Sequence, residues 1–169
     1  MNKSAVKKLK NARLWLIFVL CSLFVWVIAF YWIAQPSRSE KLEIWLGADF
    51  NLKSGLSAEI RGVSAEYGIK KCTIESYDPA DSYYAQAFAM RANSVDLYIL
   101  EKKTAEEIAE TKIFAPAPDA ADAEYLFIEG ERLGIKFVGD YYIFVNTKSD
   151  KQPELLNSVI AVLLAGAEE

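Results

Sequence analysis

The longest apolar pattern in the chain lies near its N-terminus. From Leu14 to Ala34 the sequence runs for 21 residues without a charge. About 20 apolar residues, each adding about 1.5 Å, are enough for a helix to cross the hydrocarbon core of a bilayer. Trp15 lies near one end of the run, and Tyr31 and Trp32 lie near the other, where aromatic side chains favour the membrane interface. The pattern predicts a single transmembrane helix at residues 14–34.

The charges around this run predict its orientation. Residues 1–13 hold five Lys or Arg and no acid, a local charge of +5. The whole chain has a net charge of −4, which leaves −9 for the residues after Arg13. Because basic flanks remain inside the cell, we expect a cytoplasmic tail at residues 1–13 and an extracytoplasmic body. The acidic body also argues against nucleic acid as a partner, since phosphate binding needs a basic face.

A cleaved signal peptide and a lipidated leader are two other interpretations of the apolar run. A signal peptide has an apolar region of about 7–15 residues and small residues before its cleavage site. Here the run is longer and ends in Trp32-Ile33-Ala34. Lipid attachment at Cys21 would favour a small residue before it, and Leu20 stands there. A retained anchor is therefore favoured. Pro36 ends it, and a short linker at residues 35–40 keeps the body close to the bilayer.

The body, residues 41–169, contains several segments with the alternation and β-branched content typical of strands. The expected strands are residues 41–47, 69–76, 95–100, 125–128, 133–138 and 141–146. Turn residues at 129–131 and 139–140 separate the last three strands, which predicts a hairpin region. Residues 113–122, which include Pro116 and Pro118, are expected to be irregular.

Helix patterns separate the first three strands and close the chain. The expected helices run from Leu52 to Tyr67, from Asp78-Pro79 to near Asn93, from the capping box Thr104-Ala105-Glu106-Glu107 to about Glu110, and from Ser149–Pro153 to Gly166. Asp49 or Asn51 is a candidate cap for the first helix, and Gly68 is placed to end it. Strands that alternate with helices predict an α/β fold: a single three-layer lobe with a mostly parallel sheet flanked by helices.

The residue types argue against an enzyme and against a metal or cofactor site. The chain has no histidine, and its two cysteines lie apart, one in the apolar run and one in an expected strand. The sequence contains no nucleophile elbow, phosphate-binding loop, zinc-protease motif or calcium loop. Neighbouring acids such as Glu106 and Glu107 lie on an expected exposed helix and are typical of a solvated face.

Several segments of the body resemble one protein family. They are the opening strand Leu42–Gly47, the turn Ser76-Tyr77-Asp78-Pro79, the alanine-rich segment Tyr83–Ala92, the strand Val95-Asp96-Leu97-Tyr98, and the strand Tyr142–Lys148 with its Val-Asn ending. Together they resemble the N-terminal lobe of the extracellular solute-binding proteins of ABC importers, especially the oligosaccharide-type group. The resemblance implies a periplasmic-binding-protein-like half, here as a truncated single lobe on a membrane anchor.

The carboxyl ends of the parallel strands are where open α/β sheets bind ligands. Aromatic faces and planar polar groups at that edge suit a sugar or another small polar ligand. The candidate ligand-binding residues are Trp45, Asp49, Tyr77, Asp78 and Tyr141. Three of them have ordinary structural interpretations as well: Asp78 and Asp49 as helix caps, and Trp45 as a core residue.

Two functions follow as expectations. The first is a membrane-anchored, solute-binding-protein-like recognition domain that binds a small polar ligand or sugar and is associated with a transporter. The second is a structural or interaction subunit that binds no ligand and docks a membrane protein partner.

Overall fold

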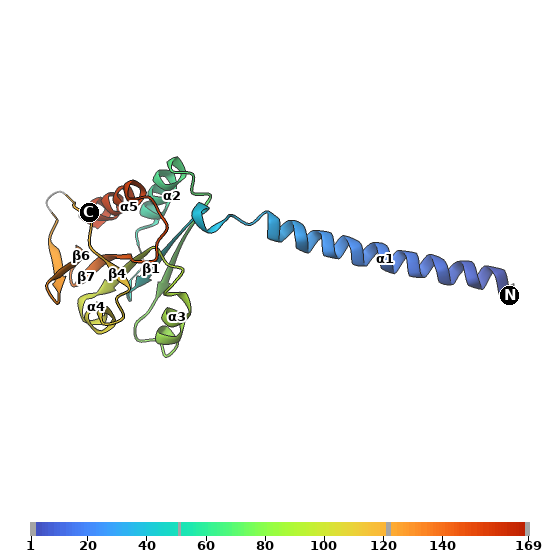
Figure 1. Cartoon of the computed structure of the whole chain (residues 1–169), viewed down its shortest axis with the longest axis horizontal. Coiled ribbons are helices and arrows are strands. Elements are labelled where there is room, and N and C mark those ends of the chain that lie inside the picture. The colour runs from blue at the N-terminus through green and yellow to red at the C-terminus, as the bar shows by residue number, and fades with distance from the viewer. Residues whose placement is uncertain (1–2, 51, 121–122, 168–169) are drawn as a thin grey trace. The chain divides into compact units, whose positions relative to one another are not determined.

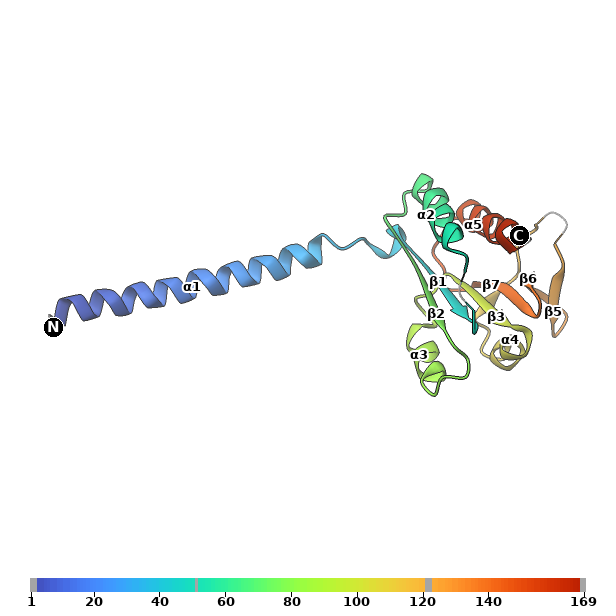
Figure 2. The same ribbon diagram turned by 180° about the vertical axis from the view of Figure 1, so that it is seen from behind.

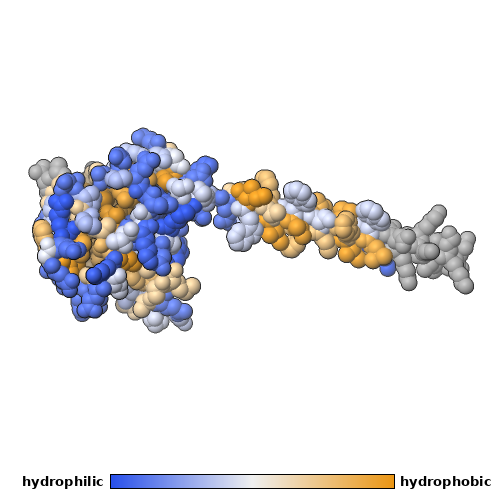
Figure 3. Space-filling view, in the orientation of Figure 1, coloured by the Kyte–Doolittle hydropathy of each residue, from blue (hydrophilic) through white to orange (hydrophobic). Residues whose placement is uncertain are grey.

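The computed structural model describes residues 3–50, 52–120 and 123–167 and divides the chain into two units, Met1–Pro36 and Ser37–Glu169. The first unit is helix α1 (Lys3–Ile33), whose segment Arg13–Ile33 is long and apolar enough to cross a membrane. Most side chains of Arg13–Ile33 are exposed, and Figure 3 shows the apolar colour along this segment. A helix is thus present where the transmembrane segment was expected, while its orientation remains a prediction.

A single mixed sheet forms the centre of the second unit. Its strands, within the described residues, are β1 (Lys41–Gly47), β2 (Lys71–Tyr77), β3 (Leu97–Glu101), β4 (Phe114–Ala115), β5 (Tyr125–Ile128), β6 (Glu131–Val138) and β7 (Tyr141–Asn146). They lie in the order β2-β1-β3-β7-β6-β5, and β4 pairs with β7. The helical elements are η1 (Arg38–Glu40), α2 (Ser54–Glu66), α3 (Tyr84–Arg91), α4 (Lys102–Ala109) and α5 (Pro153–Ala167).

The helices cover both faces of the sheet. Figures 1 and 2 show α2 and α5 together on one face and α3 and α4 on the other. Alternation along β1 explains the two layers, because Leu42, Ile44 and Leu46 are buried in the cluster that includes α2 and α5 residues. Trp45 belongs to the cluster on the opposite face, together with Tyr98. Each such side chain contributes about 1.5–3 kcal/mol when it is fully buried. The expected three-layer α/β lobe is confirmed.

The expectation of a mostly parallel sheet was wrong for the second half of the body. Strand β1 runs parallel to β2 and β3, whereas β7 is antiparallel to β3, β4 and β6, and β5 is antiparallel to β6. Strands joined by tight turns must be antiparallel, so the turns at 129–131 and 139–140 fix β5, β6 and β7 as antiparallel neighbours. The last of them, β7, then enters the sheet antiparallel to β3, which joins the two halves. The sheet is therefore parallel on one side and antiparallel on the other.

Two predicted helix starts were also wrong. Asp78 accepts a hydrogen bond from the Ala80 amide (2.8 Å), and Asp81 accepts one from the Tyr83 amide (3.0 Å). These local bonds form a turn, so α3 begins at Tyr84, five residues after Pro79. Helix α4 starts at Lys102, which places the supposed cap Thr104 inside the helix.

The first helix of the body starts later than its apolar pattern indicated. Helix α2 begins at Ser54, and the residue at its N-cap position is Lys53, not Asp49. The other candidate cap, Asn51, lies outside the described residues. Helix α2 ends at Glu66. Gly68 follows it with a φ of +80°, a value that favours glycine at the end of a helix.

A buried polar network lies at the start of β3. The Asp96 carboxylate accepts hydrogen bonds from the Glu43 amide (2.9 Å), the Ser149 hydroxyl (2.8 Å) and the Arg38 guanidinium (3.4 Å). The Lys151 ammonium lies 3.9 Å from the same carboxylate, and its side chain is only 2% exposed. Burial raises the pKa of Asp96, while these four partners act in the opposite direction. Through Asp96, the network connects Arg38 with Glu43 of β1 and with Ser149 in the segment before α5.

Candidate functional site

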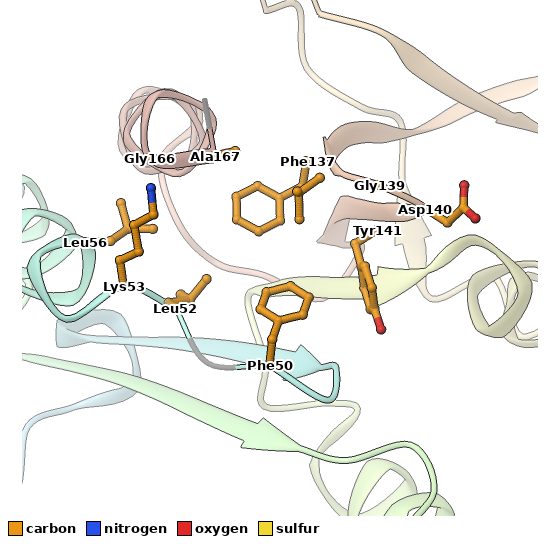
Figure 4. Close-up of a pocket in the computed structure, with 11 residues that line it drawn as sticks. Phe50, Leu52, Lys53, Leu56, Phe137, Gly139, Asp140, Tyr141, Gly166 and Ala167 are labelled. Carbon is orange, nitrogen blue, oxygen red and sulfur yellow. The ribbon is translucent and has the colours of Figure 1, made fainter. Parts of the chain in front are cut away.

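A cavity of about 380 Å³ lies at one end of the sheet, on the face that α2 and α5 cover. Its residues come from the loop after β1, the first turn of α2, the hairpin between β6 and β7, and the end of α5. They are Phe50, Leu52, Lys53, Leu56, Phe137, Val138, Gly139, Asp140, Tyr141, Gly166 and Ala167. Figure 4 shows the rings of Phe50 and Phe137 and the side chain of Leu52 around the central space. The cavity is therefore mainly apolar.

Two glycines allow the chain to close around this space. Gly139 has a φ of +53°, which favours glycine in the tight turn that presents Phe137 and Tyr141 from adjacent strands. At Gly166 a Cβ atom would lie 2.7 Å from Leu56 Cδ1, so a larger residue would force the Leu56 side chain to shift. The cavity walls depend on both positions.

The cavity lies at the carboxyl edge of the parallel strands. Strand β1 ends at Gly47 and leads to Phe50, and β7 begins at Tyr141 opposite Glu101, the last residue of β3. The rings of Phe50 and Tyr141 meet edge to face, with centroids 5.0 Å apart. This is the edge at which open α/β sheets bind their ligands.

Polar groups lie at the rim of the cavity. The Tyr141 hydroxyl donates a long hydrogen bond to Asp49 (3.4 Å). Burial and the negative charges of Asp49 and Glu101 raise the pKa of Tyr141, so its hydroxyl stays protonated and able to donate. In Figure 4 the Lys53 side chain reaches along Leu56 toward the end of α5, while Asp140 points away from the cavity. Lys53 is the cationic side chain among the residues that line the cavity.

The five residues expected at the site do not gather at one place. Tyr141 lines the cavity, and Asp49 is bonded to its hydroxyl. Trp45 is 1% exposed in the core on the opposite face, where Tyr77 stacks on it with centroids 4.0 Å apart. Asp78 is exposed and caps the turn before α3.

Sequence reasoning missed most of the cavity lining. Leu56 was expected only within the helix at residues 52–67, and neither Phe50 nor Phe137 was among the candidate ligand-binding residues. Phe50 lies in a loop and Phe137 on a strand almost ninety residues later, so no spacing in the sequence connects them. Their proximity follows from the sheet order and not from a motif.

A second polar cluster lies beside α3. The Arg91 guanidinium binds Glu75 at 2.9 Å and Glu43 at 3.0 Å, and the Tyr77 hydroxyl donates to Glu75 at 2.8 Å. Both carboxylates are paired, so this cluster offers no unpaired acid for chemistry. Within residues 3–50, 52–120 and 123–167, no group of three or more His, Cys, Asp or Glu side chains is placed to hold a metal ion.

No protein-family model matches this chain, and comparison with curated proteins gives no match either.

Proposed function

We propose that this chain is a membrane-anchored recognition domain that captures a small molecule in the cavity at the carboxyl edge of its sheet. The cavity itself is the observation that carries the proposal. Its volume of about 380 Å³ falls within the range of about 300–1,000 Å³ that is usual for small-molecule sites. It also combines an apolar lining with a few polar groups at the rim, which is the usual composition of such sites.

The lining narrows the ligand class. Phe50, Phe137 and Tyr141 offer aromatic surfaces to an apolar ring or chain, and the Tyr141 hydroxyl and Lys53 offer donors at the rim. We propose a ligand with an apolar body and one polar or anionic group. A sugar derivative that presents an apolar ring face fits this description better than a strongly hydrated free sugar, because few polar groups are available to replace its water.

The wider assignment is also a proposal. The order β1-α2-β2-α3-β3, with α5 returning to the face that α2 covers, supports a solute-binding-protein-like half. The basic residues before the apolar helix support an extracytoplasmic body that serves a transporter in the same membrane. Protease added to intact cells should digest the body; a body that survives until the cells are lysed would contradict this topology.

Ligand-observed NMR on the full chain in lipid nanodiscs tests the cavity directly. The panel contains alkyl and aryl glycosides, N-acetyl amino acids, short fatty acids and aromatic acids, with empty nanodiscs as the reference. At least one compound should show saturation transfer that Leu52→Trp abolishes, because the indole fills the cavity. Lys71→Trp, on the exposed start of β2, is the matched control and should keep the signal. A panel without a hit, or a hit that survives Leu52→Trp, would count against the proposal.

One observation favours the second candidate function, docking of a membrane protein partner. Phe127 lies on β5, at the end of the strand order, and 61% of it is exposed. An edge strand presents unpaired backbone groups with which another chain can pair, and an apolar side chain beside them adds contact area. A photo-crosslinking residue at position 127 should capture one defined membrane protein in native membranes if this function holds, and the same residue at position 71 should not.

A further inference from the structure

Two polar atoms in the core have no hydrogen-bond partner among the described residues. They are the indole nitrogen Nε1 of Trp45 and the hydroxyl of Tyr84, and both are closed off from solvent. Buried polar groups are almost always paired, because an unpaired one loses its bonds to water without replacement. Trp45 lies on the sheet face opposite the apolar cavity, so that cavity does not account for these two groups.

The two atoms converge on one point of the backbone, at Gly47. A Cβ atom at this position would lie 3.1 Å from Trp45 Nε1 and would collide with the Tyr84 hydroxyl. Gly47 is the last residue of β1, so the pair lies at the carboxyl edge of the parallel strands.

The pair cannot satisfy itself. An indole N–H only donates, whereas a phenol both donates and accepts. Even if Trp45 donates to Tyr84, the Tyr84 proton has no acceptor among the described residues. One acceptor oxygen between them would satisfy both donors at once.

The surroundings restrict what that oxygen can be. Tyr77 stacks on one face of the Trp45 indole, and Phe88 meets it edge to face at 5.6 Å, so the donor is held in place by apolar rings. The nearest cation of this cluster, Arg91, is already bound to two carboxylates. An ionised oxygen would be buried there without a counter-charge, at a high desolvation cost. A neutral carbonyl or hydroxyl oxygen that accepts these hydrogen bonds would avoid that cost.

An exposed turn leads into α3 beside the pair. Helix α3, which begins at Tyr84, has no fully buried residue, and Tyr83 in the preceding turn is 71% exposed. Helix α3 itself must stay in place, because it holds Tyr84 and Phe88 against Trp45, whereas outward movement of the turn before it would expose little core. We propose that Trp45 Nε1 and the Tyr84 hydroxyl form a second binding subsite, which takes the neutral carbonyl or hydroxyl oxygen of a small ligand when this turn moves outward.

Stability provides the first test, with a matched control in the same aromatic cluster. Tyr84→Phe removes an unpaired buried hydroxyl and should raise the melting midpoint of the full chain in detergent by about 3 °C. Tyr98→Phe removes a hydroxyl that donates to the Ala92 carbonyl (2.6 Å) and accepts from Asn146 (3.1 Å), so it should lower the midpoint. A fall for Tyr84→Phe comparable to that for Tyr98→Phe would overturn the proposal, because it would mean that the Tyr84 hydroxyl is already bonded.

Direct observation of the indole proton provides the second test. The full chain, labelled with ¹⁵N at its indoles, is titrated with acetamide and with acetate, and Trp45→Phe assigns the Trp45 signal. Acetamide should move the Trp45 N–H signal downfield at millimolar concentration, and acetate at the same concentration should move it several-fold less. Tyr84→Phe should reduce the acetamide affinity at least fivefold. An unmoved Trp45 signal, or equal responses to acetamide and acetate, would overturn the subsite.

The Trp45–Tyr84 subsite and the apolar cavity can be tested independently of each other. Leu52→Trp fills the apolar cavity without touching Trp45 or Tyr84, so it should leave the acetamide response intact. Loss of the response in Leu52→Trp would show that acetamide acts through the cavity, and would overturn the second subsite while supporting the first.

Discussion

Removal of the Asp96 carboxylate should destabilise the body more than removal of any exposed acid. Asp96→Ala leaves the Glu43 amide and the Ser149 hydroxyl without their buried acceptor. It also removes one of the two carboxylates that lie close to the Lys151 ammonium among the described residues; the other is that of Asp150. Each lost bond to a charged acceptor is worth about 1.5–3 kcal/mol, so the free energy of unfolding should fall by about 3–5 kcal/mol. That is a large part of the 5–15 kcal/mol typical of a whole domain.

A matched control separates burial from distance. Asp119 binds Arg132 at 2.7 Å, a shorter contact than any that a cation makes with Asp96, but the Asp119 side chain is 92% exposed. Because exposed ion pairs are screened by water, Asp119→Ala should leave the free energy of unfolding nearly unchanged. We therefore expect burial of the carboxylate, and not the length of the ion pair, to decide how much free energy of unfolding each substitution removes.

Urea unfolding of the full chain in detergent, followed by circular dichroism, measures both variants. Hydrogen exchange at the Glu43 amide gives a local check, since this amide should exchange faster in Asp96→Ala. Equal midpoints for Asp96→Ala and Asp119→Ala, or an unchanged exchange rate at Glu43, would refute the reasoning.

Two further predictions rest on single positions. Gly134→Ala should lower the free energy of unfolding by about 1–3 kcal/mol, since a Cβ there would lie 2.8 Å from the Phe144 ring. Gly62→Ala has open space around it and should raise the free energy of unfolding by about 0.5–1 kcal/mol in the same urea assay, because alanine favours the helix. Burial raises the pKa of the Cys72 thiol to about 11. In a Cys21→Ser background, alkylation of Cys72 by iodoacetamide at pH 8 should be about tenfold slower than that of a free thiol and should accelerate up to about pH 11; a rate that levels off near pH 9 would contradict the assigned burial.

The strand and helix patterns predicted most elements of the body and only some of the strand directions. Strand β1 and helix α2 lie where these patterns indicated, because Leu42, Ile44 and Leu46 of β1 enter the same core cluster as Leu56 and Ile60 of α2. The predicted turns account for the antiparallel order of β5, β6 and β7. The antiparallel return of β7 beside β3 was not predicted, since local periodicity carries no information on strand direction. The start of α3 was missed because the Asp78 and Asp81 carboxylates accept short-range hydrogen bonds within a turn and do not cap the helix.

Only some of the candidate residues lie at the edge of the sheet where the cavity is found. Tyr141 and Asp49 lie there because strand ends at one edge of a sheet converge. Trp45 and Tyr77 alternate onto the other face, which places them in the core cluster with α3 residues. The apolar wall at Phe137 depends on the register of β6 with β7, which the sequence pattern did not specify.

The most direct measurement of the central claim is the position of a bound ligand. Intermolecular nuclear Overhauser effects, recorded on the full chain with ¹³C-labelled methyl groups and the strongest hit from the panel, report which side chains touch it. We expect contacts from the ligand's apolar body to the methyl groups of Leu52 and Leu56 and to the ring of Phe137. Contacts confined to other surfaces, or none from a ligand that binds, would contradict the claim that this cavity is the recognition site.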